Sequence, residues 1–397
     1  MINVARPPPP IAGSFYSISR FSGLPVGIWP QRQRGCGKQL LCVFSFLVIL
    51  MGAVGEILYG VLNLSNLVSA LEAFCPGCTK AVCVLKLCHF FWSQPHWYAL
   101  KQRVRQQLWS SQDAAAQRIL QRSSRAAHRF SLLLFVSGMT TNTFFNALPL
   151  IKALYRYIYG LEGQVELPFN IILPGFATQP RWFPLTYLLL FASGACTVFT
   201  FSCVDGFFLC SCMYISGVFN VIQQDIRETF LPLIKVDRAT GGMNFVVQQR
   251  LADIVERHNA IIDLCTDLTR QITVIVLMHF LSAAFVLCST ILDIMLNSSS
   301  LSGLTYISYS VAAMTQLFLY CYGGNHVSES SAAVAQTLYD TEWYKCDVRT
   351  RKMILMILQR SQRAKTIAVP FFTPSLPAFT SILSTTGSYI TLLKTFL

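Results

Sequence analysis

Long stretches without a charged residue recur along this chain, and a transmembrane helix needs about 20 mostly apolar residues. The uncharged windows hold 22, 23, 22, 35 and 28 residues and lie between residues 129 and 152, 181 and 205, 270 and 293, 293 and 329, and 365 and 394. Two earlier apolar runs contain charges, with Glu56 in the first and Glu72, Lys80 and Lys86 in the second. The pattern predicts seven spans, at about 40–62, 67–92, 130–150, 183–213, 271–292, 303–324 and 376–396.

The connections between these spans are also patterned. Residues 97–129 and 245–270 carry apolar residues every three or four positions, which is typical of amphipathic helices. In the fourth span Asp205 is the one charge between Arg181 and Asp225, so that helix is predicted to be longer than a bilayer is thick and to project beyond it. The one long external loop that the pattern predicts covers about residues 153–182.

Composition places this pattern in a membrane. Of the 397 residues, 53% are hydrophobic and 12% are charged, and the mean hydropathy is +0.49. Soluble domains carry about 25% charged residues. The composition therefore excludes a soluble enzyme, a disordered chain and a small disulfide scaffold.

The distribution of basic residues sets the predicted orientation. Lys and Arg outnumber Asp and Glu by 31 to 18, for a net charge of +13. Of the basic residues outside the spans, 25 lie on the N-terminal side of the membrane and 4 on the other. Basic residues collect in cytoplasmic loops, so the N-terminus is predicted inside and the C-terminus outside. The fold class is an all-α integral membrane protein, and nucleic acid is not an expected partner.

Candidate chemistry is sparse. The pair Cys75 and Cys78 has CxxC spacing, but it lies inside a predicted span without a second pair, which favours packing over a metal site. The sequence His258 to Asp263 has the spacing of some acyltransferase motifs, in a periodic helix without a Gly-rich partner. No nucleotide-binding or hydrolase motif occurs. We expect no catalytic residues, no metal and no cofactor, and therefore no enzyme.

Charges inside spans point to function by default. Glu56 and Glu72 fall near predicted outer span ends, where they would snorkel or line a wet vestibule, and Lys86 falls near an inner end, where it would snorkel. Lys80 and Asp205 lie deeper. For these two, structural pairing or water exposure is favoured over a direct ligand or ion role.

The last span carries a hydroxyl stripe. Pro370, Pro374 and Pro377 prevent a helix from running through that segment. A new helix from about residue 376 places five hydroxyls on one face, at spacings of three and four: Ser381, Ser384, Ser388, Thr391 and Thr395. Such a stripe fits a water-filled pore lining and equally fits packing between helices.

Several segments resemble insect odorant receptors. These are residues 320–331 (YCYGGNHVSESS), 338–344 (LYDTEWY), 358–363 (LQRSQR), 370–372 (PFF), 388–393 (SYITLL), 24–30 (LPVGIWP) and the pair Arg257-His258. Ile390 stands where typical members have a second aromatic residue. The matches run from about residue 21 to residue 395 and are densest after residue 315.

The resemblance implies one subunit of a ligand-gated, non-selective cation channel in which four subunits surround a pore. Members combine with a common co-receptor, which has a longer connection between its fourth and fifth spans, so this chain resembles a ligand-specific tuning subunit. Carried over by position, Leu392 and Leu393 would lie at the outer gate, beside the pore-facing Thr391 and Thr395. The implied division is a cytosolic N-terminus (1–39), spans one to six with the ligand-binding bundle (40–325), cytosolic anchor helices (326–369) and a pore-lining helix (370–397).

The resemblance also implies a pocket for a small volatile ligand between the outer halves of spans two to six. It selects eight residues: Phe74, Met139, Thr143, Phe144, Phe191, Phe285, Tyr306 and Tyr309. The expected setting is the plasma membrane of olfactory sensory neurons, in a heteromer with the co-receptor and in contact with membrane lipid.

Two alternatives stay open on the sequence. A gustatory receptor-type channel is less favoured, because such receptors end on a Thr-Tyr motif followed by Gln-Phe, whereas this chain has Ser388-Tyr389 and ends on Thr395-Phe396-Leu397. A secondary transporter fits the composition, but the inverted repeats that such a fold favours are not evident.

Overall fold

The computed structural model describes residues 15–32, 35–110, 114–161, 165–296 and 302–394, and this part of the chain is helical, without a β-strand. Two short 3-10 turns, η1 (Leu231–Lys235) and η2 (Trp343–Lys345), interrupt the α-helices. The α-helices are α2 (Ser17–Gly23), α3 (Cys36–Leu62), α4 (Leu67–Trp92), α5 (Gln94–Ser110), α6 (Ala114–Ile158), α7 (Phe183–Phe230), α8 (Gly241–Leu296), α9 (Ser302–Tyr339), α10 (Val348–Ser361) and α11 (Leu376–Lys394).

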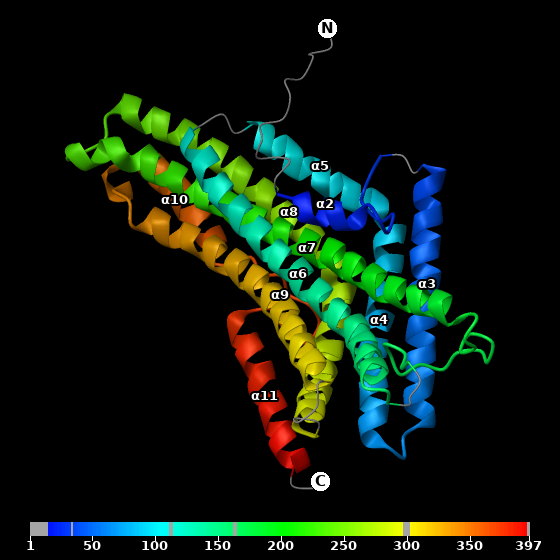
Figure 1. Ribbon diagram of the computed structural model, residues 1–397. Coiled ribbons are helices and arrows are strands. Elements are labelled where there is room, and N and C mark those ends of the chain that lie inside the picture. Colours follow the sequence, from blue (N-terminus) through cyan, green and yellow to red (C-terminus); the bar gives the residue numbers. More distant parts are fainter. Residues whose placement is uncertain (1–14, 33–34, 111–113, 162–164, 297–301, 395–397) are drawn as a thin grey trace.

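Each of the seven predicted spans falls on its own helix, namely α3, α4, α6, α7, α8, α9 and α11 (Figure 1). Within the described residues, four of these helices are by themselves long and apolar enough to cross a membrane: those that begin at Cys36, Val68, Phe183 and Gly241. The all-helical fold class is therefore confirmed.

Four helices are much longer than a bilayer requires. Helices α7 and α8 have 48 and 56 residues, and at 1.5 Å per residue they extend roughly 72 and 84 Å, against a hydrocarbon core of about 30 Å. Together with α6 and α9 they run past α3 and α4 and end beside α10 (Figure 1). The prediction that the helix of the fourth span is longer than a bilayer is thick is confirmed, and its projection beyond the membrane stays a prediction.

The connections differ from the sequence prediction in two places. The expected helix at 97–129 is two helices, because α5 ends at Ser110 and α6 begins at Ala114. The expected loop at 153–182 starts later, because α6 stays helical through Ile158. Helix α9 passes residue 326 without a break, so the predicted transition to a cytosolic anchor lies within one continuous helix, and the cytosolic placement of 326–369 stays a prediction.

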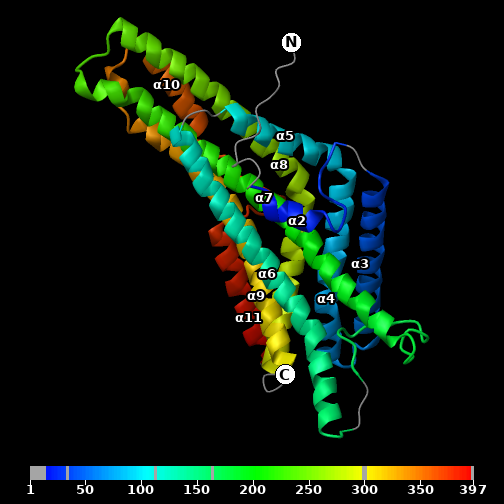
Figure 2. The ribbon, with the colours of Figure 1, turned by 45° about the horizontal axis from the view of Figure 1, so that its top comes forward.

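Local chemistry explains several helix ends. The Asp347 carboxylate accepts from the backbone N–H of Thr350 at 2.9 Å and caps α10. Between α10 and α11 the chain makes a tight turn in which Val369 and Phe372 pair, with Phe371 at φ 75°. Helix α11 then begins at Leu376, as the prolines predict, and packs against α8 and α9 (Figure 2).

Helix α7 is the centre of the bundle. It contacts α2, α3, α4, α6, α8 and α9, and nearly every side chain from Thr197 to Gly217 is buried. Helix α3 is peripheral and leaves apolar side chains exposed along one face: Leu40, Leu41, Val43, Phe44, Leu47, Val54 and Leu58. A surface of this kind suits lipid contact, because hydrocarbon replaces water around it.

Candidate functional site

A cavity lies among α4, α6, α7, α8 and α9. We call it the inner cavity. Like small-molecule sites, it is mostly apolar with a few polar groups. The described apolar lining includes Val82, Val198, Phe201, Ala283, Val286, Ala312 and Ala313.

A second space, which we call the outer space, lies next to the inner cavity, toward the segment that joins α6 to α7. Its lining is more polar and includes Glu72, Lys152, Glu166, Asn170 and Tyr306. Phe145 and Phe169 line both spaces. Their rings stack with centroids 5.1 Å apart, so this aromatic pair separates the outer space from the inner cavity.

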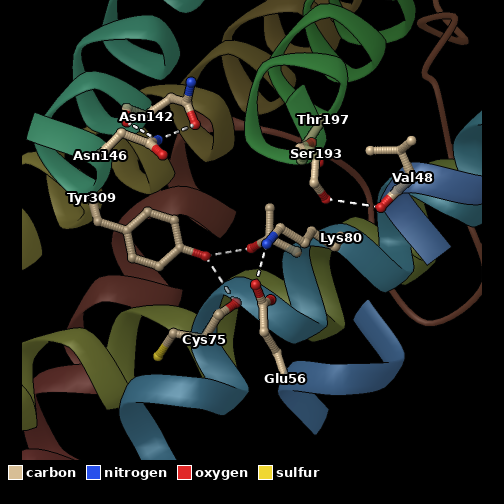
Figure 3. Close-up of polar contacts among 10 residues, drawn as sticks. Val48, Glu56, Cys75, Lys80, Asn142, Asn146, Ser193, Thr197 and Tyr309 are labelled. Atoms are coloured by element: carbon tan, nitrogen blue, oxygen red, sulfur yellow. Dashed lines mark hydrogen bonds and ion pairs between the residues drawn. The ribbon is translucent and has the colours of Figure 1, made fainter. Parts of the chain in front are cut away.

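One predicted ligand residue, Tyr309 on α9, lines the inner cavity. Its hydroxyl donates to the Cys75 carbonyl at 2.9 Å and also contacts the hydroxyl of Thr79, both on α4 (Figure 3). These contacts tie α9 to α4 beside the cavity.

Lys80 forms an ion pair with Glu56, which joins α4 to α3 (Figure 3). The Lys80 ammonium also lies 3.7 Å from the centroid of the Phe169 ring. Glu56 is 0% exposed, and its second carboxylate oxygen, Oε2, has no hydrogen-bond partner. The expectation that Glu56 snorkels or lines a vestibule is wrong, because a partner on the neighbouring helix holds it inside.

Lys86 forms the second buried pair. Its ammonium lies 2.8 and 2.9 Å from the two oxygens of Asp205 on α7. The same carboxylate accepts from the Tyr320 hydroxyl at 2.6 Å and from the Gln316 amide, both on α9. Lys86 is 2% exposed, so the expectation that it snorkels is also wrong. A structural pairing was favoured for Lys80 and for Asp205, and the geometry agrees, because Lys80 pairs with Glu56 and Asp205 pairs with Lys86.

The other predicted ligand residues lie around the inner cavity without lining it. Tyr306 lines the outer space, and Phe74 packs on Gly60 of α3. Met139 is half-buried and Thr143 is exposed. Phe144, Phe191 and Phe285 are 37%, 41% and 40% exposed and face away from the bundle. A ligand role for this set stays a prediction.

Sequence reasoning missed several lining residues, among them Asn142, Phe145, Phe169, His279 and Gln316. Two of them carried a usable signal. Asn142 and His279 are polar side chains in the middle of uncharged windows, and such residues in a span mark the interior of a bundle. The neighbouring residues Phe144 and Phe145 could not be separated in this way, because both are aromatic.

The hydroxyl stripe of α11 faces away from its own subunit. Ser384, Ser388 and Thr391 are exposed, whereas Ile382 and Leu383 pack against the core. Leu392 belongs to α11, but its side chain, like that of Leu393, is not among those described, and Thr395 lies outside the described residues. The pore role of these residues stays a prediction.

The remaining motifs do not assemble a reactive site. Cys75 is buried and Cys78 is half-buried, and no group of three or more potential metal ligands occurs within the described residues. His258 is buried against Phe219, while Asp263 is exposed. Burial and the nearby Arg360 lower the pKa of His258 to about 4, so this side chain is neutral at physiological pH.

Comparison with known proteins gives consistent matches. A family model described as "7tm Odorant receptor" matches residues 66–387. Odorant receptor 22c of Drosophila melanogaster is 69% identical over 98% of each chain, and Odorant receptor 10a of the same species is 32% identical over 96% of each. The solved structure of the insect olfactory receptor OR5 from Machilis hrabei in complex with eugenol covers 97% of this chain and 98% of its own, with a TM-score of 0.77 at 13% identity.

Proposed function

Since this chain belongs to the odorant receptor family of insects, we propose that it is a ligand-binding subunit of a ligand-gated, non-selective cation channel. The observation that carries the proposal is the inner cavity, a mostly apolar space whose two lining lysines are both neutralised by buried carboxylates. Such a site suits a small uncharged volatile molecule.

The cavity lies where binding is able to bias channel opening. Its lining includes residues of α8 and α9, and α11 packs against the same two helices. Phe280, beside the lining residue His279, stacks on Phe372 in the turn before α11, with ring centroids 4.3 Å apart. A ligand that shifts α8 would therefore move the turn from which the proposed pore helix starts.

The exposed hydroxyl face of α11 supports the pore assignment. Ser384, Ser388 and Thr391 are exposed, so they are free to face an axis shared by several subunits. We propose a heterotetramer with the family's co-receptor, in the plasma membrane of olfactory sensory neurons. The matching relatives are described as odorant receptors, which favours this function over a gustatory channel or a transporter.

The proposed function is tested by recording ionic currents. We expect cells that express this chain together with an odorant co-receptor to pass an inward cation current when a volatile panel is applied. Cells that express the co-receptor alone are the control for its own response. Surface-expressed chain that adds no ligand-evoked current over that control, across the whole panel, would contradict the proposal.

A further inference from the structure

The inner cavity contains two polar atoms without a partner, in contrast to its other polar groups. Of the described lining residues, Lys80 and Lys86 are ion-paired, and Gln316 donates to Asp205. The remaining hydroxyls and the thiol of Cys83 are also bonded, namely those of Thr79, Thr141, Thr197, Ser282 and Tyr309. Asn142 Nδ2 and His279 Nε2 are buried and have no hydrogen-bond partner.

The Asn142 amide is held in one orientation by its neighbours. Asn146 Nδ2 donates to the Asn142 side-chain oxygen at 3.3 Å and to the Asn142 backbone carbonyl at 2.7 Å (Figure 3). Since the oxygen of this amide already accepts, the group left over is a donor. Gly194 of α7 lies so close that an added Cβ would be 1.9 Å from the Asn142 oxygen, which fixes the amide further.

The His279 ring is equally fixed. It stacks on Tyr320 with ring centroids 4.7 Å apart, and Tyr320 is held by its hydrogen bond to Asp205. A neutral imidazole offers one donor and one acceptor nitrogen, according to tautomer. Nε2 is therefore able to donate to a ligand group or to accept from it.

Asn142 and His279 have different neighbours along the cavity lining. Asn142 is three residues from Phe145, which borders the outer space. His279 stacks on Tyr320, which donates to Asp205, the partner of Lys86. A ligand therefore needs two polar groups, or one polar group and a bridging water, to bond both atoms.

A buried donor without a partner is costly in the empty protein, and a ligand that supplies an acceptor removes that cost. We propose that Asn142 and His279 determine ligand specificity, and that the ligand is a small uncharged molecule whose carbonyl or ether oxygen accepts from Asn142 Nδ2. His279 Nε2 bonds a second polar group, directly or through one water. This inference rests on the proposed function, because it takes the inner cavity to be the ligand site.

The chemistry of the lining also excludes other ligand classes. An organic cation would meet the ammonium groups of Lys80 and Lys86, and the described lining contains no carboxylate. A pure hydrocarbon fits the apolar walls but leaves both polar atoms unpaired. The cavity therefore selects oxygenated volatiles over hydrocarbons of the same shape.

The experiment compares ligands that differ only in this oxygen. Acetophenone is paired with α-methylstyrene, and cyclohexanone with methylenecyclohexane, so that a C=CH₂ group replaces C=O. Binding is measured by the thermal shift of the purified chain, and gating by current with the co-receptor. We expect the ketone of each pair to act at an about tenfold lower concentration, the effect of one hydrogen bond.

The variants separate recognition from structure. Asn142→Leu should remove the preference for the ketone, and His279→Phe, which keeps an aromatic ring on Tyr320, should weaken ligands with two polar groups. Both ligand-free variants should melt at or above the wild-type temperature, because each loses an unpartnered polar atom. Thr140→Val, on the exposed face of α6, is the matched control.

The outcomes distinguish this inference from the proposed function. Equal potency within both pairs, or a preference for charged volatiles, would overturn the specificity assignment while leaving the receptor function in place. An unchanged preference in Asn142→Leu would do the same. If no volatile shifts the melting temperature or opens the channel, the proposed function fails as well.

Discussion

Two ion pairs lie inside the membrane bundle, and they differ in how fully their carboxylates are satisfied. Asp205 accepts four hydrogen bonds, two from Lys86 and one each from Tyr320 and Gln316. Glu56 accepts from Lys80 alone, and its Oε2 has no partner. A buried pair repays its desolvation only when further hydrogen bonds complete it. The Lys86–Asp205 pair, which we call the inner pair, is therefore the structural junction of α4, α7 and α9. The Lys80–Glu56 pair, which we call the outer pair, should tolerate substitution better.

Breaking the inner pair should have the largest effect. Asp205→Ala leaves the Lys86 ammonium buried without a counter-ion and removes the acceptor of Tyr320, so we expect a loss of about 3–5 kcal/mol of stability. The measurement is thermal melting of the detergent-solubilised chain, together with its surface fraction in cells. The double variant Lys86→Met/Asp205→Leu should recover much of the loss.

The control for this prediction is an exposed pair. Arg103 and Asp267 pair outside the predicted spans with more than a third of each side chain exposed, and such pairs contribute about 0–1 kcal/mol. Asp267→Ala should therefore melt close to wild type. If Asp205→Ala melts like Asp267→Ala, the inner pair is not a structural junction.

Another buried titratable group, His258, sharpens the comparison because it lies outside the predicted spans and its Nε2 has no hydrogen-bond partner. Its pKa is lowered to about 4 by burial and by Arg360, against about 6.5 in the unfolded chain. Between these values the unfolded chain binds more protons, so stability falls as pH falls. We expect a loss of up to about 2 kcal/mol between pH 7.5 and pH 5.

Melting curves measured across this pH range test the His258 prediction. The variant His258→Phe keeps a ring against Phe219 but has no proton to bind, so its stability should depend less on pH. An equally steep pH dependence in wild type and variant would place the titrating group elsewhere.

Of the two buried pairs, the outer pair should lose less stability when its carboxylate is replaced. Glu56→Gln keeps an acceptor for Lys80, and the Phe169 ring face still attracts the ammonium. We expect a loss of about 1–1.5 kcal/mol, the difference between the net value of a hydrogen bond to a charged group and that of a neutral one. Melting under the same conditions as Asp205→Ala gives the ranking, and a larger loss for Glu56→Gln would reverse the comparison of the two pairs.

The sequence predicted the helices well and the contacts between them poorly. Uncharged windows located five of the seven spans, and two apolar runs that contain charges located the other two, since a bilayer imposes a similar length on each. Three prolines located the start of α11. Lys86 was expected to snorkel because Asp205, its partner, lies 119 residues away. A pairing across helices depends on their relative rotation, which no local pattern records.

The same limit applies to the candidate site. The resemblance indicated the helices around the cavity, and it placed Tyr309 at its lining. It did not give the rotation of α6, so Phe144 was selected although Phe145 faces inward. Asn142 and His279 were recognisable as isolated polar residues in apolar spans, but only the packing shows that each retains an unpartnered atom.

The claim that the inner cavity is the ligand site is tested most directly by filling it. Ala313 of α9 lines the cavity, while Val311, two residues away, is 49% exposed on the outer surface of the same helix. Currents with the co-receptor are recorded for Ala313→Phe and Val311→Phe over a volatile panel at matched surface expression. The account predicts that Ala313→Phe raises the half-maximal concentration at least about tenfold, the effect of about 1.4 kcal/mol of lost binding, while Val311→Phe responds like wild type. Equal responses from both variants would contradict the account.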